Sequence, residues 1–213
     1  MRGSHHPLSP FAGPSYGGFQ TFQWGVTFPD FMDGLVPVVT APKGGGSDQP
    51  VKDLIARLAT DPNWNGGWYY ERGGITKVLT DMRVDTLKAY GIEAQLAPSI
   101  RDPQTREIAI RKLAEPWARA FDGHSLVVLR RAMVRFNAEK DFSHIRAKVL
   151  YVLSRTDKIF PPSLAPPVME KLKAAHVDAA YFEIDSENGH LASGTDAAKW
   201  APTLRAFIDR LPR

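Results

Sequence analysis

A serine between two glycines near the start of the chain is the first candidate for chemistry. Residues 13–17 read Gly-Pro-Ser-Tyr-Gly, a Gly-x-Ser-x-Gly pattern typical of a nucleophile elbow on a tight strand-to-helix turn, where small residues let backbone segments pass closely. Phe19, Phe22 and Val26 then recur with the spacing of one helix face, so a helix is expected after the serine. Ser15 is therefore a candidate nucleophile, and an ordinary glycine-rich turn is the alternative.

An acid and a histidine follow two predicted strands in the last third of the chain. The apolar run 149–153 predicts a buried strand with Asp157 just beyond it, and the run 180–184 predicts another with His190 in the loop that follows. Catalytic groups in open α/β sheets gather beyond the carboxyl ends of the strands. We expect His190 to act as general base for Ser15 and Asp157 to orient the imidazole ring.

Each of these residues also has a simpler explanation. His190 alone would be a loop histidine, and Asp157 alone would be a helix N-cap or a turn aspartate. Asp185 and Glu187 are further acids near the histidine, ranked second because they share its loop. The backbone N–H of Tyr16, the residue after the candidate nucleophile, is the expected oxyanion donor at the start of the helix.

The elements that position these residues predict an α/β fold with a mostly parallel sheet. A β-branched run at 35–40 predicts a second strand, and a Pro- and Gly-rich stretch at 41–50 marks a subdomain boundary. Helical periodicity then dominates, at 51–58, 75–82 and 126–133, before strands return. We expect a core of residues 7–41 and 145–213, a helical lid of residues 42–144, and an expression-tag remnant at 1–6.

Two smaller features belong to the expected core and lid. The aromatic cluster Trp64, Trp68, Tyr69 and Tyr70 is expected in the core of the lid, with contact to substrate as the alternative. The final helix is expected to pack against the sheet through apolar residues on one face. These residues are Trp200, Leu204, Phe207, Ile208 and Leu211.

Composition narrows the class of protein. Hydrophobic residues make up 43% of the chain and charged residues 23%, which is ordinary for a soluble globular domain. The formal net charge of +4 is spread along the chain, so no nucleic-acid partner is expected. No apolar run is long enough for a membrane span. Because there is no cysteine, disulfides and thiolate zinc sites are excluded, and we expect a cytoplasmic protein without a metal or bound cofactor.

Several phrases of the sequence together resemble the homoserine O-acetyltransferase group of α/β-hydrolases, whose triad also runs Ser, Asp, His along the chain. The resemblance extends from Gly13 to the C-terminus. It is carried by Gly-Pro-Ser-Tyr-Gly-Gly-Phe-Gln at 13–20 with Trp24 and Phe-Pro-Asp-Phe at 28–31, Asp-Pro-Asn-Trp-Asn-Gly-Gly at 61–67, the phrase 121–133, Ala-Lys-Val-Leu through Phe-Pro-Pro at 147–162, and Glu-Ile-Asp-Ser through Gly-His at 183–190.

The resemblance implies an α/β-hydrolase fold, a covalent acyl-enzyme on the elbow serine and a helical lid. Arg131 matches a substrate-binding arginine of the family, with an exposed lid arginine as the alternative, and acetyl-CoA is the implied co-substrate. Two departures stand out. Leu191 replaces the aspartate thought to hold the homoserine amine, and the family's strands before the elbow are missing, so the chain looks like the C-terminal half of such a protein.

The expected function is therefore a serine-dependent acyl-ester hydrolase that acts on a small-molecule ester. One alternative is acyl transfer from acetyl-CoA. Another is a truncated, catalytically impaired module that needs a partner segment. Because the strand at 10–12 would lack a neighbour on one side, we expect either a homo-oligomer or a requirement for the missing N-terminal half.

Overall fold

The computed structural model describes residues 10–212, which form two compact units. The first contains residues 10–44 and 136–212, and the second contains residues 45–135. The first unit holds all the strands of the described chain, whereas the second is built from helices. The proposed tag remnant at 1–6 lies outside the described residues.

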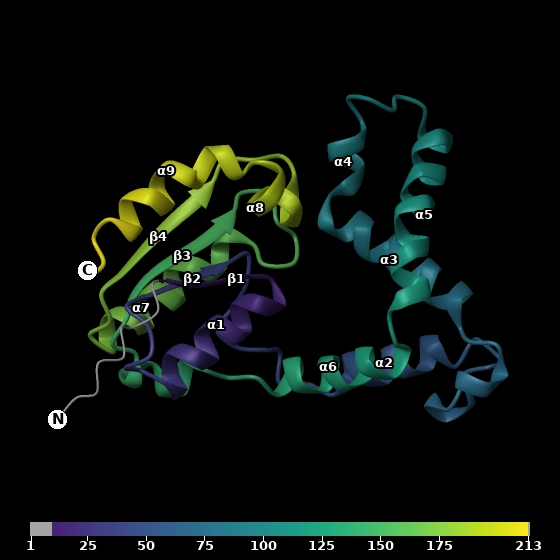
Figure 1. The fold of residues 1–213 in the computed structure, drawn as a ribbon, viewed down its shortest axis with the longest axis horizontal. Helices are drawn as coiled ribbons and strands as arrows, with labels where there is room; N and C mark the ends of the chain where they lie inside the picture. The colour runs from purple at the N-terminus through teal and green to yellow at the C-terminus, as the bar shows by residue number, and fades with distance from the viewer. Residues whose placement is uncertain (1–9, 213) are drawn as a thin grey trace. The chain divides into compact units, whose positions relative to one another are not determined.

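The first unit is built on a four-stranded parallel sheet in the order β1-β2-β3-β4 (Figure 1). The strands are β1 (Phe11–Pro14), β2 (Gly34–Val38), β3 (Lys148–Ser154) and β4 (Ala179–Ile184). Every pairing is parallel. The carboxyl ends of all four strands therefore lie at the same edge of the sheet, and the predicted α/β class is confirmed.

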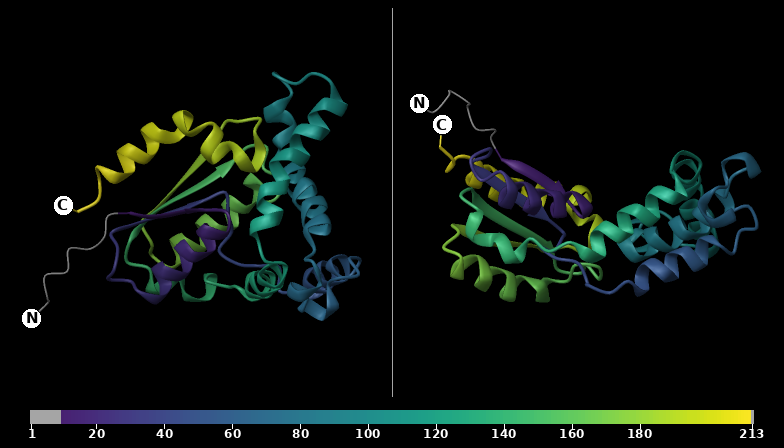
Figure 2. Two further views of the ribbon diagram at one scale, coloured as in Figure 1. Left: turned by 45° about the vertical axis from the view of Figure 1, so that its right-hand side comes forward. Right: turned by 90° about the horizontal axis from the view of Figure 1, so that it is seen from below.

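Helices cover both faces of this sheet, as Figure 2 shows. On one face, Leu35 and Tyr151 pack with Phe22 of α1 (Tyr16–Thr27) and Leu172 of α7 (Ala165–Ala174). On the other face, alternate strand residues such as Val36 pack with α9 (Ala197–Ile208), which follows the short helix α8 (Ala192–Thr195). Side chains alternate across a strand, so the continuous apolar runs in the sequence reflect a sheet that is buried on both faces.

Two sequence predictions in this unit need adjustment. The run expected to form a strand at 35–40 pairs only as far as Val38, because Val39 adopts a left-handed φ of 43° that ends the strand. In the final helix, Phe207 is buried, whereas Ile208 is exposed and does not join the apolar face. The face predicted for the first helix is confirmed, because Phe19, Phe22 and Val26 are all buried.

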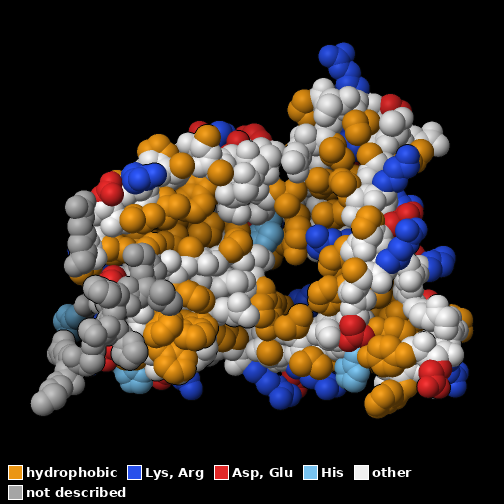
Figure 3. Space-filling view, in the orientation of Figure 1, with side chains coloured by type: hydrophobic (Ala, Val, Ile, Leu, Met, Phe, Trp, Pro, Cys, Tyr) orange, Lys and Arg blue, Asp and Glu red, His pale blue; other side chains and the backbone are white. Residues whose placement is uncertain are grey.

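An exposed aromatic cluster lies at the C-terminal end of α1, where Figure 3 shows hydrophobic side chains gathered on the surface. Trp24, Phe28 and Phe31 are each more than one third exposed, and the Trp24 ring contacts both of the others. Trp24 also contacts Phe11 of β1. Within residues 10–212, β1 pairs with β2 alone. An apolar surface therefore lies beside a sheet edge, a combination that favours association with other chains.

The second unit consists of helices around its own apolar core. They are α2 (Gln49–Leu58), α3 (Thr76–Tyr90), α4 (Ile92–Leu96), α5 (Pro103–Ala120) and α6 (Gly123–Arg135). The sequence pattern located α2, α3 and α6 but did not single out α5, whose buried residues include two alanines. No helix within the described range 10–212 is long and apolar enough to cross a membrane.

The aromatic cluster of the second unit divides into a buried pair and an exposed pair. Trp64 and Tyr69 are buried in the core, whereas Trp68 and Tyr70 are exposed. The Tyr69 hydroxyl donates to the Asp122 carboxylate and accepts the Gly123 backbone N–H. The expected role in the lid core therefore fits two of the four residues.

Asp122 is the acceptor at the centre of this arrangement. It accepts hydrogen bonds from Tyr69 and Tyr70 and from both the backbone N–H and the hydroxyl of Ser125 at the start of α6. Burial by itself would raise the pKa of the Asp122 carboxyl, but these hydrogen bonds outweigh it and hold the pKa well below its usual range. Burial likewise raises the pKa of Tyr69 to about 12.

The backbone turn that holds Ser15 is formed by close packing between β1 and α1. Ser15 has a φ of 53°, and its N–H donates to the Val38 carbonyl over 2.9 Å. A Cβ atom on Gly13 would lie 2.3 Å from the Gly17 carbonyl oxygen, and one on Gly18 would lie 2.3 Å from Thr40. A Cβ on Gly17 would meet nothing closer than 3.6 Å. The motif predicted close backbone packing at both glycines that flank Ser15. This prediction is wrong for Gly17, because the close contacts lie at Gly13 and Gly18.

The elbow packing predicts opposite outcomes for its two motif glycines. Gly13→Ala should lower the free energy of unfolding by about 1–3 kcal/mol or more, because the clash is with backbone that cannot rotate away. Gly17→Ala should be tolerated or slightly stabilising, since alanine favours a helix by about 1 kcal/mol over glycine. Urea unfolding of both variants is the measurement. Equal destabilisation by the two substitutions would contradict the packing described here.

The Asp122 hydrogen bonds predict a pH-dependent contribution to stability. Asp122→Asn should lower the free energy of unfolding by about 1 kcal/mol near neutral pH. The folded-state pKa is depressed, so this contribution is complete above the ordinary value of 3.8 and is lost as the pH falls towards the folded-state pKa. Urea unfolding at about pH 7 and about pH 3 should therefore show a smaller gap between wild type and variant in acid.

Asp85→Asn is the matched control, because Asp85 lies in the same unit in an exposed pair with Arg57. Exposed pairs contribute little, so this variant should follow the wild type at both pH values. A gap for Asp122→Asn that is the same in acid and at neutral pH would refute the assignment.

Candidate active site

The three residues selected from the sequence form one hydrogen-bonded chain at the carboxyl edge of the sheet. His190 Nε2 lies 2.8 Å from Ser15 Oγ, and His190 Nδ1 lies 2.8 Å from Asp157 Oδ2. Ser15 follows β1, Asp157 follows β3 and His190 follows β4. A carboxylate can only accept, so Nδ1 carries the ring proton and the Nε2 lone pair faces the serine hydroxyl.

Asp157 is held by its own loop. Its side chain is buried, and its Oδ1 atom accepts the backbone N–H groups of Ile159 and Phe160 over 2.8 and 3.1 Å. With Oδ1 occupied in this way, Oδ2 is left for the histidine. The carboxylate therefore needs no rearrangement to orient the imidazole ring.

His190 is also buried, at 5% exposure, and lies on a short helical turn from Gly189 to Leu191. The Phe160 ring lies 5.7 Å from the imidazole ring between centroids. The two acids of the histidine's own loop, Asp185 and Glu187, pair instead with Arg155. Of these three acids, Asp157 is the one that lies within hydrogen-bond distance of the imidazole.

The N-terminus of α1 supplies donors beside Ser15. The Tyr16 amide is the first N–H of this helix, and the first four N–H groups of a helix have no acceptor within it. They also carry the positive end of the helix dipole. Because Ser15 is only partly buried, a substrate carbonyl can approach its hydroxyl at this helix end. The arrangement is suited to stabilising negative charge.

Arg131 lies on α6 in the second unit, where it is exposed to solvent. Leu191, by contrast, follows His190 directly and is half-buried. The role of Arg131 as a substrate-binding residue stays a prediction.

Sequence reasoning missed three residues at this edge. Val39 keeps a strained left-handed backbone and donates its N–H to the Val152 carbonyl over 2.7 Å. Phe160 packs on the histidine, and the Thr156 hydroxyl contacts the histidine loop. No sequence signal marks Val39, whereas Thr156 and Phe160 flank Asp157 in the phrase already assigned to the acid loop.

The site has no metal-binding character in the part of the chain that is described. Across residues 10–212, no group of three or more His, Asp or Glu side chains is placed to hold a metal ion.

Comparisons with known proteins find similarity to proteins named as homoserine O-acyltransferases and as esterases. No family model matches it. A homoserine O-succinyltransferase from Herminiimonas arsenicoxydans is 26% identical over 224 residues, covering 93% of this chain and 58% of that protein. The crystal structure of a homoserine O-acetyltransferase from Bacillus anthracis superimposes with a TM-score of 0.81 at 23% identity, covering 96% of this chain and 61% of that one.

A mutant of esterase E22 is equally similar in structure, with a TM-score of 0.81 at 20% identity over 95% of this chain and 61% of the esterase chain. Transferases and esterases thus share the fold, and this chain spans about three fifths of their length. The chain has the α/β-hydrolase fold, and its sequence is similar to the homoserine O-acyltransferases of that fold.

Proposed function

We propose that this chain is a serine-dependent acyl-ester hydrolase that works through a covalent acyl-enzyme on Ser15. The observation that carries the proposal is the unbroken hydrogen-bonded chain from Ser15 through His190 to Asp157, with both contacts at 2.8 Å. Three side chains from three strand ends meet in an order that activates a hydroxyl. Relatives and structural neighbours named as acyltransferases and esterases support the same chemistry.

Acylation begins with proton transfer to the histidine. Nε2 of His190 takes the Ser15 hydroxyl proton as Oγ bonds to the ester carbonyl carbon, and the carbonyl electron pair moves onto oxygen. Asp157 stabilises the imidazolium that results. The electron pair on the oxygen then re-forms the carbonyl as the bond to the leaving alcohol breaks, and Nε2 gives its proton to that alcohol. The acyl group remains on Ser15.

The oxyanion formed in this step needs a donor. The Tyr16 amide, at the N-terminus of α1, is the proposed donor, and a single such donor is worth about 10²–10³ in rate. The Ser15 amide is not available for this purpose, because it donates to the Val38 carbonyl. Oxyanion stabilisation from this part of the chain therefore centres on Tyr16.

Deacylation decides between hydrolysis and transfer. If water attacks the acyl-enzyme, with His190 taking one of its protons, the product is a free acid. If the hydroxyl of homoserine attacks, the product is its ester, and acetyl-CoA or another acyl-CoA is the acyl donor. Arg131 is the proposed contact for such substrates, on the family likeness alone. Action on small molecules in the cytoplasm also belongs to this proposal.

Leu191 is the reason we favour hydrolysis. It directly follows His190 and is half-buried, and the resemblance places there the aspartate that would hold the amine of homoserine. A leucine side chain cannot pair with an ammonium group, and a charge left unpaired in a pocket is costly. An amino-acid acceptor would therefore bind poorly, whereas water needs no such partner.

The acyl-enzyme is tested by mass spectrometry after brief incubation with an activated acetyl ester such as p-nitrophenyl acetate. The wild-type chain should gain one acetyl group on Ser15. Ser15→Ala should gain none, and His190→Ala should be nearly as impaired because both act in one proton transfer. Asp157→Asn should react roughly 10⁴-fold more slowly if the tautomer is lost as in serine proteases.

Ser99→Ala serves as a control for surface acylation, since it removes an exposed serine of the second unit. Its acetylation should match that of the wild type. If the peptide that contains residue 15 were still acetylated in the Ser15→Ala variant, Ser15 would not be the nucleophile.

The choice between water and an amine-bearing acceptor is tested at Leu191. Leu191→Asp should raise the ratio of homoserine acetylation to ester hydrolysis, because it provides a carboxylate for the ammonium group. Leu191→Asn, which has the same shape without the charge, is the matched control and should change the ratio much less. The ratio is measured by separating O-acetylhomoserine from acetate. No difference between the two variants would refute the charge argument.

A further inference from the structure

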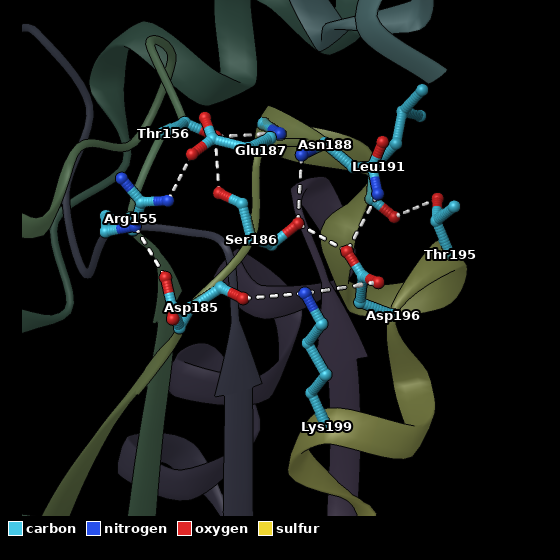
Figure 4. Close-up of polar contacts among 11 residues, drawn as sticks. Arg155, Thr156, Asp185, Ser186, Glu187, Asn188, Leu191, Thr195, Asp196 and Lys199 are labelled. Carbon is cyan, nitrogen blue, oxygen red and sulfur yellow. Dashed lines mark hydrogen bonds and ion pairs between the residues drawn. The ribbon is translucent and has the colours of Figure 1, made fainter. Parts of the chain in front are cut away.

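The loops that carry Asp157 and His190 are joined by the hydroxyl of Thr156 (Figure 4). Thr156 Oγ1 donates to the Ser186 carbonyl oxygen over 2.8 Å and accepts the Gly189 N–H over 3.1 Å. Thr156 directly precedes Asp157, and Gly189 directly precedes His190. One hydroxyl therefore connects the two residues next to the acid and the base.

Both contacts depend on the dual character of a hydroxyl. A serine or threonine oxygen donates one proton and accepts at its lone pairs, so it can serve a carbonyl and an N–H at the same time. The two partners are the ends of the segment Ser186 to Gly189, which Thr156 thus closes into a turn. Gly189 has a φ of 55° within this turn. Valine has the same shape as threonine but can make neither bond.

Asp196 accepts hydrogen bonds from side chains on the other side of the same turn. Its carboxylate accepts from the Ser186 hydroxyl and from the Asn188 side-chain amide, the latter over 2.8 Å. These bonds, led by that of Ser186, hold the pKa of the Asp196 carboxyl below its usual value. Asp196 precedes α9 and also pairs with Lys199 of that helix, so it anchors the turn to the helix layer (Figure 4).

Arg155 also reaches across to the histidine loop, through Asp185 and Glu187. The Asp185 and Glu187 side chains are 87% and 74% exposed, and exposed ion pairs contribute little because water and salt screen them. The Thr156 contacts are to backbone groups and are partly buried. They are therefore the stronger restraint between the loops, apart from the bond between Asp157 and His190 itself.

We propose that Thr156 is a positioning residue for His190, whose hydroxyl fixes the histidine loop relative to Asp157 and Ser15. The effect of Thr156 on catalysis rests on the proposed function. The effect of Thr156 on the position of His190 does not, because Asp157 holds the imidazole whether or not the chain turns over an ester. Loss of the hydroxyl frees the turn at both ends, and a displacement of about 1 Å at a reacting group can lower a rate by about 10².

The experiment compares Thr156→Val and Thr156→Ala with Thr156→Ser, which keeps both hydrogen bonds. Thr195→Val is the matched control, because Thr195 lies near the same loop and its hydroxyl donates to the Leu191 carbonyl within one helical turn. The first readout is the proton NMR signal of His190 Nδ1–H, which is sharp while the proton is held by Asp157 and broadens when it exchanges with water. The second is the rate of Ser15 acylation by p-nitrophenyl acetate.

The valine and alanine variants should remain folded, lose the sharp Nδ1–H signal and acylate about 10- to 100-fold more slowly. The serine and Thr195→Val variants should keep the signal and a rate within a few-fold of wild type. Retention of the signal in the valine or alanine variant would overturn the proposal. So would unfolding of both variants, since it would make Thr156 a residue of general stability.

A wild-type chain that does not acylate, yet loses its His190 signal on Thr156→Val, would contradict the proposed function and leave the positioning role standing. Normal acylation in every Thr156 variant would contradict the positioning role and leave the proposed function standing. The two ideas therefore fail in different ways.

Discussion

The candidate site depends on the parallel hydrogen-bond ladder of the sheet. β1, β2, β3 and β4 all run in the same direction, so the residues that follow β1, β3 and β4 emerge at one edge. Ser15 and His190 are 175 positions apart in sequence, and no local interaction brings them together. If β3 or β4 were antiparallel, Asp157 or His190 would lie at the opposite edge of the sheet, and the hydrogen bonds that link the three residues could not form.

The ladder brings the loops together, and the local backbone then aims the side chains. Ser15 and Val39 hold left-handed φ angles at neighbouring strand ends, a conformation that costs about 1–3 kcal/mol for such residues. The tight packing of Gly13 and Gly18 maintains the turn against this cost. Asp157 is fixed by two backbone N–H groups, and the histidine turn is fixed from both sides by Thr156 and Asp196. Strain at the nucleophile is thus offset by packing around it.

Residue type and spacing were sufficient to predict the parts of this arrangement that are local. The elbow motif, the strand around Leu150 and the strand before His190 each lie in a short window with a clear pattern. The Thr156 contacts were not predictable in this way, because their partners are about thirty positions away and depend on the packing of two loops. The same is true of Gly17 and Gly18, where only the observed approach of Thr40 shows which glycine is required. Helix α5 was missed because its buried face uses alanines, which give a weak periodic signal.

The central claim is that Ser15 is an activated nucleophile in the folded chain. The most direct test is labelling with a fluorophosphonate probe, which bonds to a serine oxygen only when a neighbouring base activates it, followed by peptide mapping. We predict one adduct, on the peptide containing Ser15, formed by the native chain and absent after unfolding in urea. Native chain that remains unlabelled, or that is labelled at other serines to the same extent, would contradict the account.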